Sequence, residues 1–119
     1  MPHLTIEYSQ NLTPFPEAEV LHAVNAALCA HPEVAQESDL KTRTVPVASF
    51  AIGTQPARRA FVHAQLRLLS GRTPEAKQAL SALVLQALHP LVPRPDGVQV
   101  QLSVEVVDMD RASYQKERW

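Results

Sequence analysis

Hydrophobic and polar residues alternate along four short stretches of the chain, and apolar residues recur every three or four positions along two longer ones. Alternation is typical of strands, and the longer spacing is typical of amphipathic helices. The pattern predicts helices at about Pro16–Ala30 and Thr73–His89. It predicts strands at His3–Tyr8, Leu40–Phe50, Arg59–Leu69 and Val98–Val107. The order of elements is therefore strand, helix, strand, repeated once.

The two halves of the chain match when the sequence is shifted so that His3 falls on His63. Thr13 then falls on Thr73, and each is followed by a proline. The apolar positions of the two predicted helices coincide as well, with Val20, Val24, Ala27 and Leu28 falling on Leu80, Val84, Ala87 and Leu88. An internal repeat of this kind indicates a duplicated structural unit.

We expect an α+β fold in which two fused β-α-β units, at about residues 2–50 and 59–108, form one four-stranded sheet with two helices on one face. The whole chain is then a single domain, and the charged residues 109–119 form a tail. The outer face of the sheet is polar without being strongly charged, which suits either solvent or a subunit interface. Its expected members are His3, Thr5, Glu7, His63, Gln65, Arg67, Gln99, Gln101, Ser103 and Glu105.

The second predicted helix has clear signals at both ends. Thr73 is a good N-cap, Pro74 suits the first helical position, and Pro90 stops the helix. The first helix follows a proline-rich stretch at residues 13–16, so its start is less sharply defined.

Composition narrows the class of protein. The chain has 119 residues, 45% of them hydrophobic, which is enough for one core without disulfides or a structural metal. The net charge of −1 does not favour nucleic acid as a partner. The one cysteine, Cys29, cannot form an internal disulfide, and no apolar run reaches the ~20 residues of a membrane span. With no secretory signal at the amino terminus, these features predict a soluble, cytoplasmic protein.

Positions that the two halves do not share are candidates for function, because shared positions report the scaffold. Three such positions carry chemistry in one half only: Pro2 falls on Val62, Arg72 on Leu12, and Arg43 on Ser103. Removal of Met1 would leave Pro2 with a free secondary amine, which is a candidate base. Such an amine needs burial and cationic neighbours to be free of its proton at neutral pH.

Arg72 and Arg43 are candidates for holding substrate carboxylates, which a guanidinium grips with two hydrogen bonds. Arg72 lies between a predicted strand and a helix N-terminus, where backbone amides favour anions. Each arginine also has a simpler interpretation. Arg72 can be a solvated loop residue, and Arg43 can be an outer-face residue paired with Glu7 or Glu105.

Three segments together carry a family resemblance: Met1–Asn11, Ala60–His63, and Ser70–Thr73 with the helix that follows. They resemble the 5-carboxymethyl-2-hydroxymuconate isomerase family of the tautomerase superfamily, and the similarity runs from Pro2 to about Val107. The resemblance implies a homotrimer of fused β-α-β units that uses no metal or organic cofactor. The charge and the absence of a long apolar run separately predict that the chain binds neither nucleic acid nor membranes.

The resemblance also implies a reaction. Pro2 would take a proton from the enol hydroxyl of a carboxylated dienol and deliver one to a distal carbon. The implied substrate is 5-carboxymethyl-2-hydroxymuconate, from the catabolism of aromatic compounds. Arg72 and Arg43 match arginines that hold its carboxylates and stabilise the dienolate. Lys41 stands where a relative can carry another arginine, and Phe50 resembles an apolar wall of the site.

Two other classes of protein remain open. The same strand order occurs in ferredoxin-like RNA-recognition domains, and Arg58–Val62 resembles an RNA-binding strand. Against this interpretation, the counterpart strand offers Thr5 and Glu7 where stacked bases need aromatic side chains. The second alternative is a trimer that kept the scaffold and lost catalysis.

No metal site is predicted, because the five histidines lack the spacing of metal ligands.

Overall fold

The computed structural model describes residues 1–119. Its helices are α1, Glu17–Cys29, and α2, Pro74–Leu88, and neither is long and apolar enough to cross a membrane. Its strands are β1 at His3–Ser9, β2 at Lys41–Val47, β3 at Arg59–Leu69 and β4 at Gln99–Met109. Short 3-10 turns occupy Gln10–Leu12 and Glu37–Asp39. The predicted order of strands and helices is confirmed.

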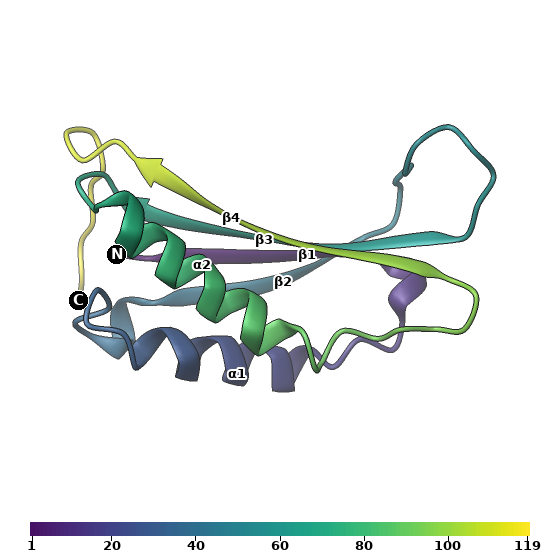
Figure 1. The fold of residues 1–119 in the computed structure, drawn as a ribbon. Coiled ribbons are helices and arrows are strands. Elements are labelled where there is room, and N and C mark those ends of the chain that lie inside the picture. Colours follow the sequence, from purple (N-terminus) through teal and green to yellow (C-terminus); the bar gives the residue numbers. More distant parts are fainter.

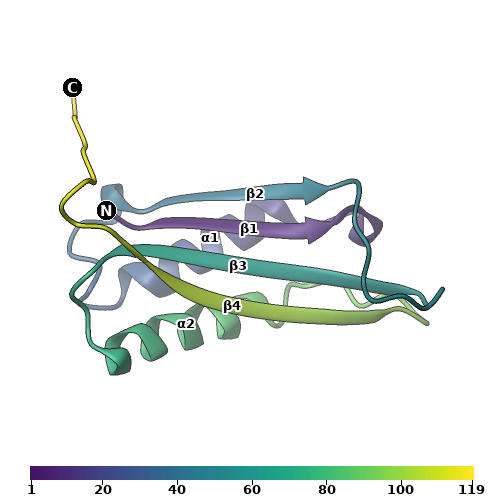
Figure 2. The same cartoon turned by 90° about the horizontal axis from the view of Figure 1, so that it is seen from above.

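The four strands form one mixed sheet in the order β2-β1-β3-β4. Within each repeat the two strands run parallel, and the repeats meet where β1 and β3 pair antiparallel. Both helices lie on one face of the sheet (Figure 1), and the view from above shows the other face without a covering layer (Figure 2). The expected α+β fold of two fused β-α-β units is therefore confirmed.

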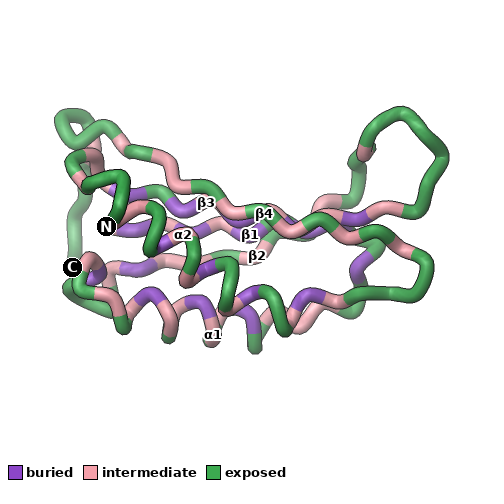
Figure 3. The backbone as a smooth tube through the Cα atoms, in the orientation of Figure 1, coloured by how far each residue is buried: buried purple, intermediate pink, exposed green.

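The core lies between the sheet and the two helices (Figure 3). At its centre are matching apolar positions of the repeat, all fully buried: Val20, Val24 and Leu28 from α1, and Leu80, Val84 and Leu88 from α2. Strand residues that face the helices, such as Leu4, Ile6 and Leu66, are also fully buried. Each aliphatic side chain of this size contributes about 1.5–3 kcal/mol when it leaves water. The helical spacing in each half is thus the pattern that closes the core.

The helix starts differ in the two repeats. Thr73 caps α2 as predicted, because its hydroxyl oxygen accepts a hydrogen bond from the backbone N–H of Ala76 at 3.1 Å. Pro74 follows in the first turn, where a missing N–H removes no helical hydrogen bond. The first helix begins at Glu17, directly after Pro16, and has no side-chain cap.

Two predicted strand ends are wrong by a few residues, and strand pairing explains both. The strand expected to reach Phe50 ends at Val47, because its partner β1 also ends there. The strand expected to end at Val107 continues to Met109, because β3 still offers backbone partners at that point. Residues 48–58 instead form a loop that projects from the body of the molecule (Figure 1).

The outer face of the sheet carries a hydrogen-bonded polar cluster. Nδ1 of His63 lies 2.7 Å from the hydroxyl of Ser103, and Nε2 lies 2.7 Å from a carboxylate oxygen of Glu105. The contact with His63 holds the pKa of the Glu105 carboxyl below its usual range. This face is therefore polar and internally paired, as its alternation predicts.

The charged tail returns to the amino-terminal end of the chain instead of extending into solvent (Figure 1). The hydroxyl of Tyr114 lies 3.1 Å from Nε2 of His3. Lys116 and Arg118 each bind the same carboxylate oxygen of Asp39 at 2.6 Å. Side-chain contacts thus tie the last residues of the chain to its first strand and to the turn before β2.

Candidate functional site

A cavity of about 230 Å³ lies at the end of the sheet where β1 begins and β3 ends. Its lining includes Pro2, Glu33, Asp39, Arg72 and Arg111. These residues come from the amino terminus, the loop after α1, the turn before α2 and the start of the tail. Of the residues predicted from the sequence to form a site, the cavity brings together Pro2 and Arg72.

Pro2 is buried at the start of the sheet. Its carbonyl oxygen accepts a hydrogen bond from the backbone N–H of Lys41 at 3.1 Å, which ties the amino terminus to β2. Burial lowers the pKa of the neighbouring Met1 amino group below its usual value. Among the charges nearby, Asp39 raises this pKa, whereas several cations, Lys41 first among them, lower it. An amine at this place therefore loses its proton more readily than one in water.

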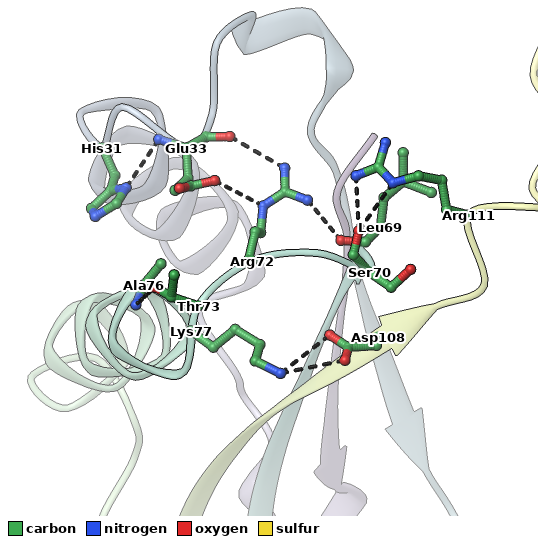
Figure 4. Close-up of polar contacts among 10 residues, drawn as sticks. All are labelled: His31, Glu33, Leu69, Ser70, Arg72, Thr73, Ala76, Lys77, Asp108 and Arg111. Atoms are coloured by element: carbon green, nitrogen blue, oxygen red, sulfur yellow. Dashed lines mark hydrogen bonds and ion pairs between the residues drawn. The ribbon is translucent and has the colours of Figure 1, made fainter.

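Arg72, which lines the cavity together with Pro2, is held in place by contacts with Glu33 and Leu69 (Figure 4). Its Nε lies 3.0 Å from a carboxylate oxygen of Glu33 as an ion pair without hydrogen-bond geometry, and Nη1 donates to the carbonyl of Leu69 at 2.8 Å. Only 18% of the side chain is exposed, so Arg72 is not a solvated loop residue. The turn depends on Gly71, whose φ of 116° is strained for residues with a Cβ.

Lys41 and Asp39 lie next to each other at the edge of the cavity. The Lys41 ammonium donates to the backbone carbonyl of Asp39, and burial lowers the pKa of Lys41. The hydrogen bond from Lys116, with the charges of Lys116 and Arg118, holds the pKa of the Asp39 carboxyl below its usual range. Lys41 itself is therefore close to the cavity without lining it.

Arg43 lies outside the cavity, on the outer face of the sheet, where it pairs in register with Thr5. Its Nη2 lies 2.9 Å from Nδ1 of His3. The carboxylates of Glu7 and Glu105 are not its partners, so that part of the simpler interpretation is wrong. Burial, and then the nearby cations, lower the pKa of His3, which keeps this imidazole neutral at pH 7 and able to accept from Arg43.

Phe50 lies at the opposite end of the sheet from Pro2. Because β1 and β2 are parallel, with His3 beside Lys41, residues that follow β2 lie beyond the far end of β1. A strand of this length spans roughly 20 Å. Phe50 instead meets Phe61 edge to face, with 5.9 Å between ring centroids. Within one chain, Phe50 does not contribute to the cavity that contains Pro2.

Three charged residues of the cavity were missed by sequence reasoning: Glu33, Asp39 and Arg111. Glu33 and Asp39 lie in the long loop after α1, where no periodicity marks a position. Arg111 was assigned to a charged tail. The predicted topology could have located Arg111. Because β3 and β4 are parallel neighbours, they end at the same edge of the sheet, and the residues after β4 lie next to the turn after β3.

Comparisons with known proteins agree with this architecture. The family model described as 5-carboxymethyl-2-hydroxymuconate isomerase matches residues 2–118. The crystal structure of a 5-carboxymethyl-2-hydroxymuconate isomerase from Deinococcus radiodurans R1 is 27% identical, with a TM-score of 0.77 over 98% of this chain and 88% of that one. No curated protein sequence gives a significant match.

Two further solved structures share the fold at lower identity. A 5-carboxymethyl-2-hydroxymuconate delta-isomerase is 21% identical, with a TM-score of 0.81 over 100% of this chain and 89% of that one. A fused 4-OT wild type symmetric trimer is also 21% identical, with a TM-score of 0.66 over 92% and 87% of the two chains. The family match covers nearly the whole chain, including Pro2, Arg72 and the returning tail. The chain therefore belongs to the 5-carboxymethyl-2-hydroxymuconate isomerase family and is an isomerase of the tautomerase type.

Proposed function

We propose that this chain converts 5-carboxymethyl-2-hydroxymuconate from its enol to its keto form, as a step in the catabolism of aromatic compounds, with Pro2 as base and acid. The Pro2 nitrogen, freed by removal of Met1, accepts the proton of the enol hydroxyl. The electron pair of that O–H bond forms the carbonyl, and the double bonds shift along the diene. The distal carbon then takes the proton back from the Pro2 ammonium, so protons and electrons balance without a further reactant.

The observation that carries this proposal is the shared cavity of Pro2 and Arg72. A carboxylate bound by Arg72 would hold the dienol next to the Pro2 nitrogen, and the cation would stabilise the charge that develops on the dienolate. The surroundings that lower the pKa of the Met1 amine would act on a Pro2 amine in the same direction.

We propose in addition that the active form is a homotrimer. The fold is shared with a fused 4-OT protein described as a trimer, and the outer sheet face has no covering layer in the single chain (Figure 2). Arg43 lies on that face and Phe50 lies at the far end of the sheet, so neither lines the Pro2 cavity of its own chain. In the proposed trimer, both serve the cavity of a neighbouring copy, and Lys41 adds positive charge at its edge.

The test compares two forms of the protein that differ only at the amino terminus. One form begins at Pro2, with loss of Met1 verified by intact mass, and the other carries one alanine before Pro2. We expect the first to convert the dienol, followed by loss of its ultraviolet absorbance, and the second to be inactive because its Pro2 nitrogen is an amide. Circular dichroism and sedimentation should show the same fold and assembly for both. Full activity in a protein whose mass includes Met1 would refute this mechanism.

The same assay separates the alternative classes. A protein with a free Pro2 amine, correct assembly and no activity on any carboxylated dienol would be a non-catalytic scaffold. The strand that resembles an RNA-binding motif contains one aromatic residue, Phe61, and its ring already packs edge to face with Phe50. This contact argues against RNA binding, because bases need aromatic rings on which to stack. A filter-binding measurement with single-stranded RNA should therefore show no retention at physiological salt.

A further inference from the structure

We propose that Arg111 is a specificity-determining residue that binds an additional carboxylate of the substrate at the rim of the Pro2 cavity. We further propose that residues 110–119, named here the C-terminal strap, hold it there. This inference rests on the proposed function and deepens it. The C-terminal strap would then contribute to the choice of substrate.

The position of Arg111 is set by the sheet. Strand β4 ends at Met109 beside the last residue of β3, so the next residues turn across the start of the β3–α2 turn. There Nε and Nη2 of Arg111 both donate to the carbonyl of Ser70, at 3.0 and 2.9 Å. Figure 4 shows Arg111 on one side of this turn and Arg72 on the other, each bound to one of two successive carbonyls. Both side chains line the same cavity.

The two guanidinium groups differ in how their charges are balanced. Arg72 pairs with the carboxylate of Glu33, whereas Arg111 has no carboxylate partner in the structure. A guanidinium has five N–H donors, and the two contacts with Ser70 leave those of Nη1 unused. Arg111 is therefore the arginine of this cavity whose charge is not balanced by a carboxylate of the chain, and its Nη1 can bind an additional incoming carboxylate.

The C-terminal strap fixes the segment that carries Arg111. Lys116 and Arg118 both bind Asp39, which lines the cavity on the side of the loop after α1. Tyr114, which lies between Arg111 and Lys116 in the chain, contacts His3. The chain after β4 thus crosses the end of the sheet where β1 begins (Figure 1). It is bound to two parts of the cavity lining, the β3–α2 turn through Arg111 and Asp39 through Lys116 and Arg118. Holding the segment in advance reduces the entropy lost when a ligand binds Arg111.

The chemistry of the proposed substrate gives Arg111 a specific task. A 2-hydroxymuconate has two carboxylates, one at each end of the diene, and the carboxymethyl group adds a third. Arg72 lies deep in the cavity and is suited to the carboxylate nearest the reacting enol, whereas Arg111 is exposed at the rim. Arg111 is therefore placed to select the tricarboxylate over the dicarboxylate.

The first experiment measures this selection in the protein that begins at Pro2. We compare kcat/KM for 5-carboxymethyl-2-hydroxymuconate and for 2-hydroxymuconate in the unchanged protein, Arg111→Gln and Arg111→Lys. The ratio of the two values should fall about fivefold to tenfold in Arg111→Gln, since the lost contact is charged but partly exposed. Arg111→Lys keeps the charge but cannot bind two carboxylate oxygens at once, so its ratio should lie between those of the unchanged protein and Arg111→Gln. Arg94→Gln removes an arginine outside the cavity and should leave the ratio unchanged.

The second experiment has a readout that needs no turnover. Titration calorimetry compares binding of propane-1,2,3-tricarboxylate with that of glutarate, which lacks the central carboxylate. We expect the unchanged protein and Arg94→Gln to prefer the tricarboxylate, and Arg111→Gln to lose that preference. An unchanged kinetic ratio and an unchanged binding preference in folded Arg111→Gln would overturn the assignment of Arg111 while leaving the proposed function intact. Inactivity of the unchanged protein on both dienols would instead overturn the proposed function, and the binding preference would still decide the role of Arg111.

Discussion

At the scale of single residues, the cavity places an amino terminus among arginine and lysine side chains whose charges are only partly balanced. Glu33 pairs with Arg72, and Asp39 pairs with Lys116 and Arg118. Cations near an amine favour its neutral form, because they disfavour a second positive charge. The same cations attract the carboxylates of a substrate. In the proposed reaction, one arrangement of charge would thus serve both the base and substrate binding.

Replacing Arg72 tests this arrangement directly. Arg72→Ala should lower kcat/KM for the carboxylated dienol about 10- to 150-fold, because a charged hydrogen bond of about 1.5–3 kcal/mol is lost. Arg72→Lys should be intermediate, since it restores charge but cannot bind two oxygens at once. Both variants should show the circular dichroism spectrum of the unchanged protein. A folded Arg72→Ala protein with undiminished kcat/KM would exclude a role for Arg72 in binding the substrate.

At the scale of elements, the two halves repeat the same scaffold but differ in the side chains that their turns carry. Arg72 projects into the cavity from the turn after β3, whereas its counterpart Leu12 is almost completely buried in the core after β1. The turn after β3 also supplies the Thr73 cap, which the first helix lacks. The turn that supplies Arg72 to the cavity and a well-defined helix start therefore occur together in the second repeat.

The Thr73 cap should be measurable as stability. Thr73→Ala leaves an N–H of the first turn of α2 without its side-chain partner and should lower the free energy of unfolding by about 1 kcal/mol. Thr73→Ser keeps the hydroxyl and is the matched control, with little expected loss. Urea denaturation followed by circular dichroism compares the three proteins, and equal midpoints would show that the cap does not stabilise the helix.

The attachment of the C-terminal strap should depend on pH through Asp39. The contact with Lys116 lowers the pKa of the folded Asp39 below the ~3.9 of a free aspartate, so the attachment is fully present above that value. It should be lost as pH falls through the lowered pKa, when the carboxylate becomes neutral. Trp119, the one tryptophan of the chain, is exposed but directly follows Arg118, so its fluorescence anisotropy should be higher above pH 4 than below it.

Asp39→Asn is the control for this titration. The variant cannot form the ion pairs with Lys116 and Arg118, so its Trp119 anisotropy should be low already at neutral pH. Anisotropy that is equal in the two proteins at pH 7 would show that Asp39 does not hold the strap in solution.

At the scale of the whole molecule, the single chain covers one face of its sheet and leaves the other face and two strand edges open (Figure 2). On the open face, His63 is paired with Ser103 and Glu105, and Arg43 is paired with His3. Polar groups that are already hydrogen-bonded within the chain, as these are, can be covered by another subunit without being left unpaired. The closed assembly of three copies in our proposal would use this face.

Sedimentation velocity tests the assembly. At micromolar concentration, the protein should sediment as one species with three times the mass of the single chain. A monomer under these conditions would contradict the homotrimer and, with it, the proposed roles of Arg43 and Phe50 in a neighbouring cavity.

The sequence by itself determined the features that depend on neighbours along the chain. Alternating and helical spacings predicted all strands and helices in order, and the matching positions Val24 and Val84 are fully buried at the core. Thr73 was recognised as a cap because capping involves only the next few residues. The unmatched positions of the repeat also pointed to Pro2 and Arg72, which the fold brings to one cavity.

The tertiary structure alone decided which distant residues meet. The pairing of Arg72 with Glu33 and the return of the strap to Asp39 join segments far apart in the sequence. The separation of Phe50 from Pro2 follows from the parallel pairing of β1 and β2. Periodicity reports which face a residue occupies, but it carries no information on which strand ends lie side by side. That choice is made by packing of the whole sheet and its helices, and it is what places Arg111 at the rim of the cavity.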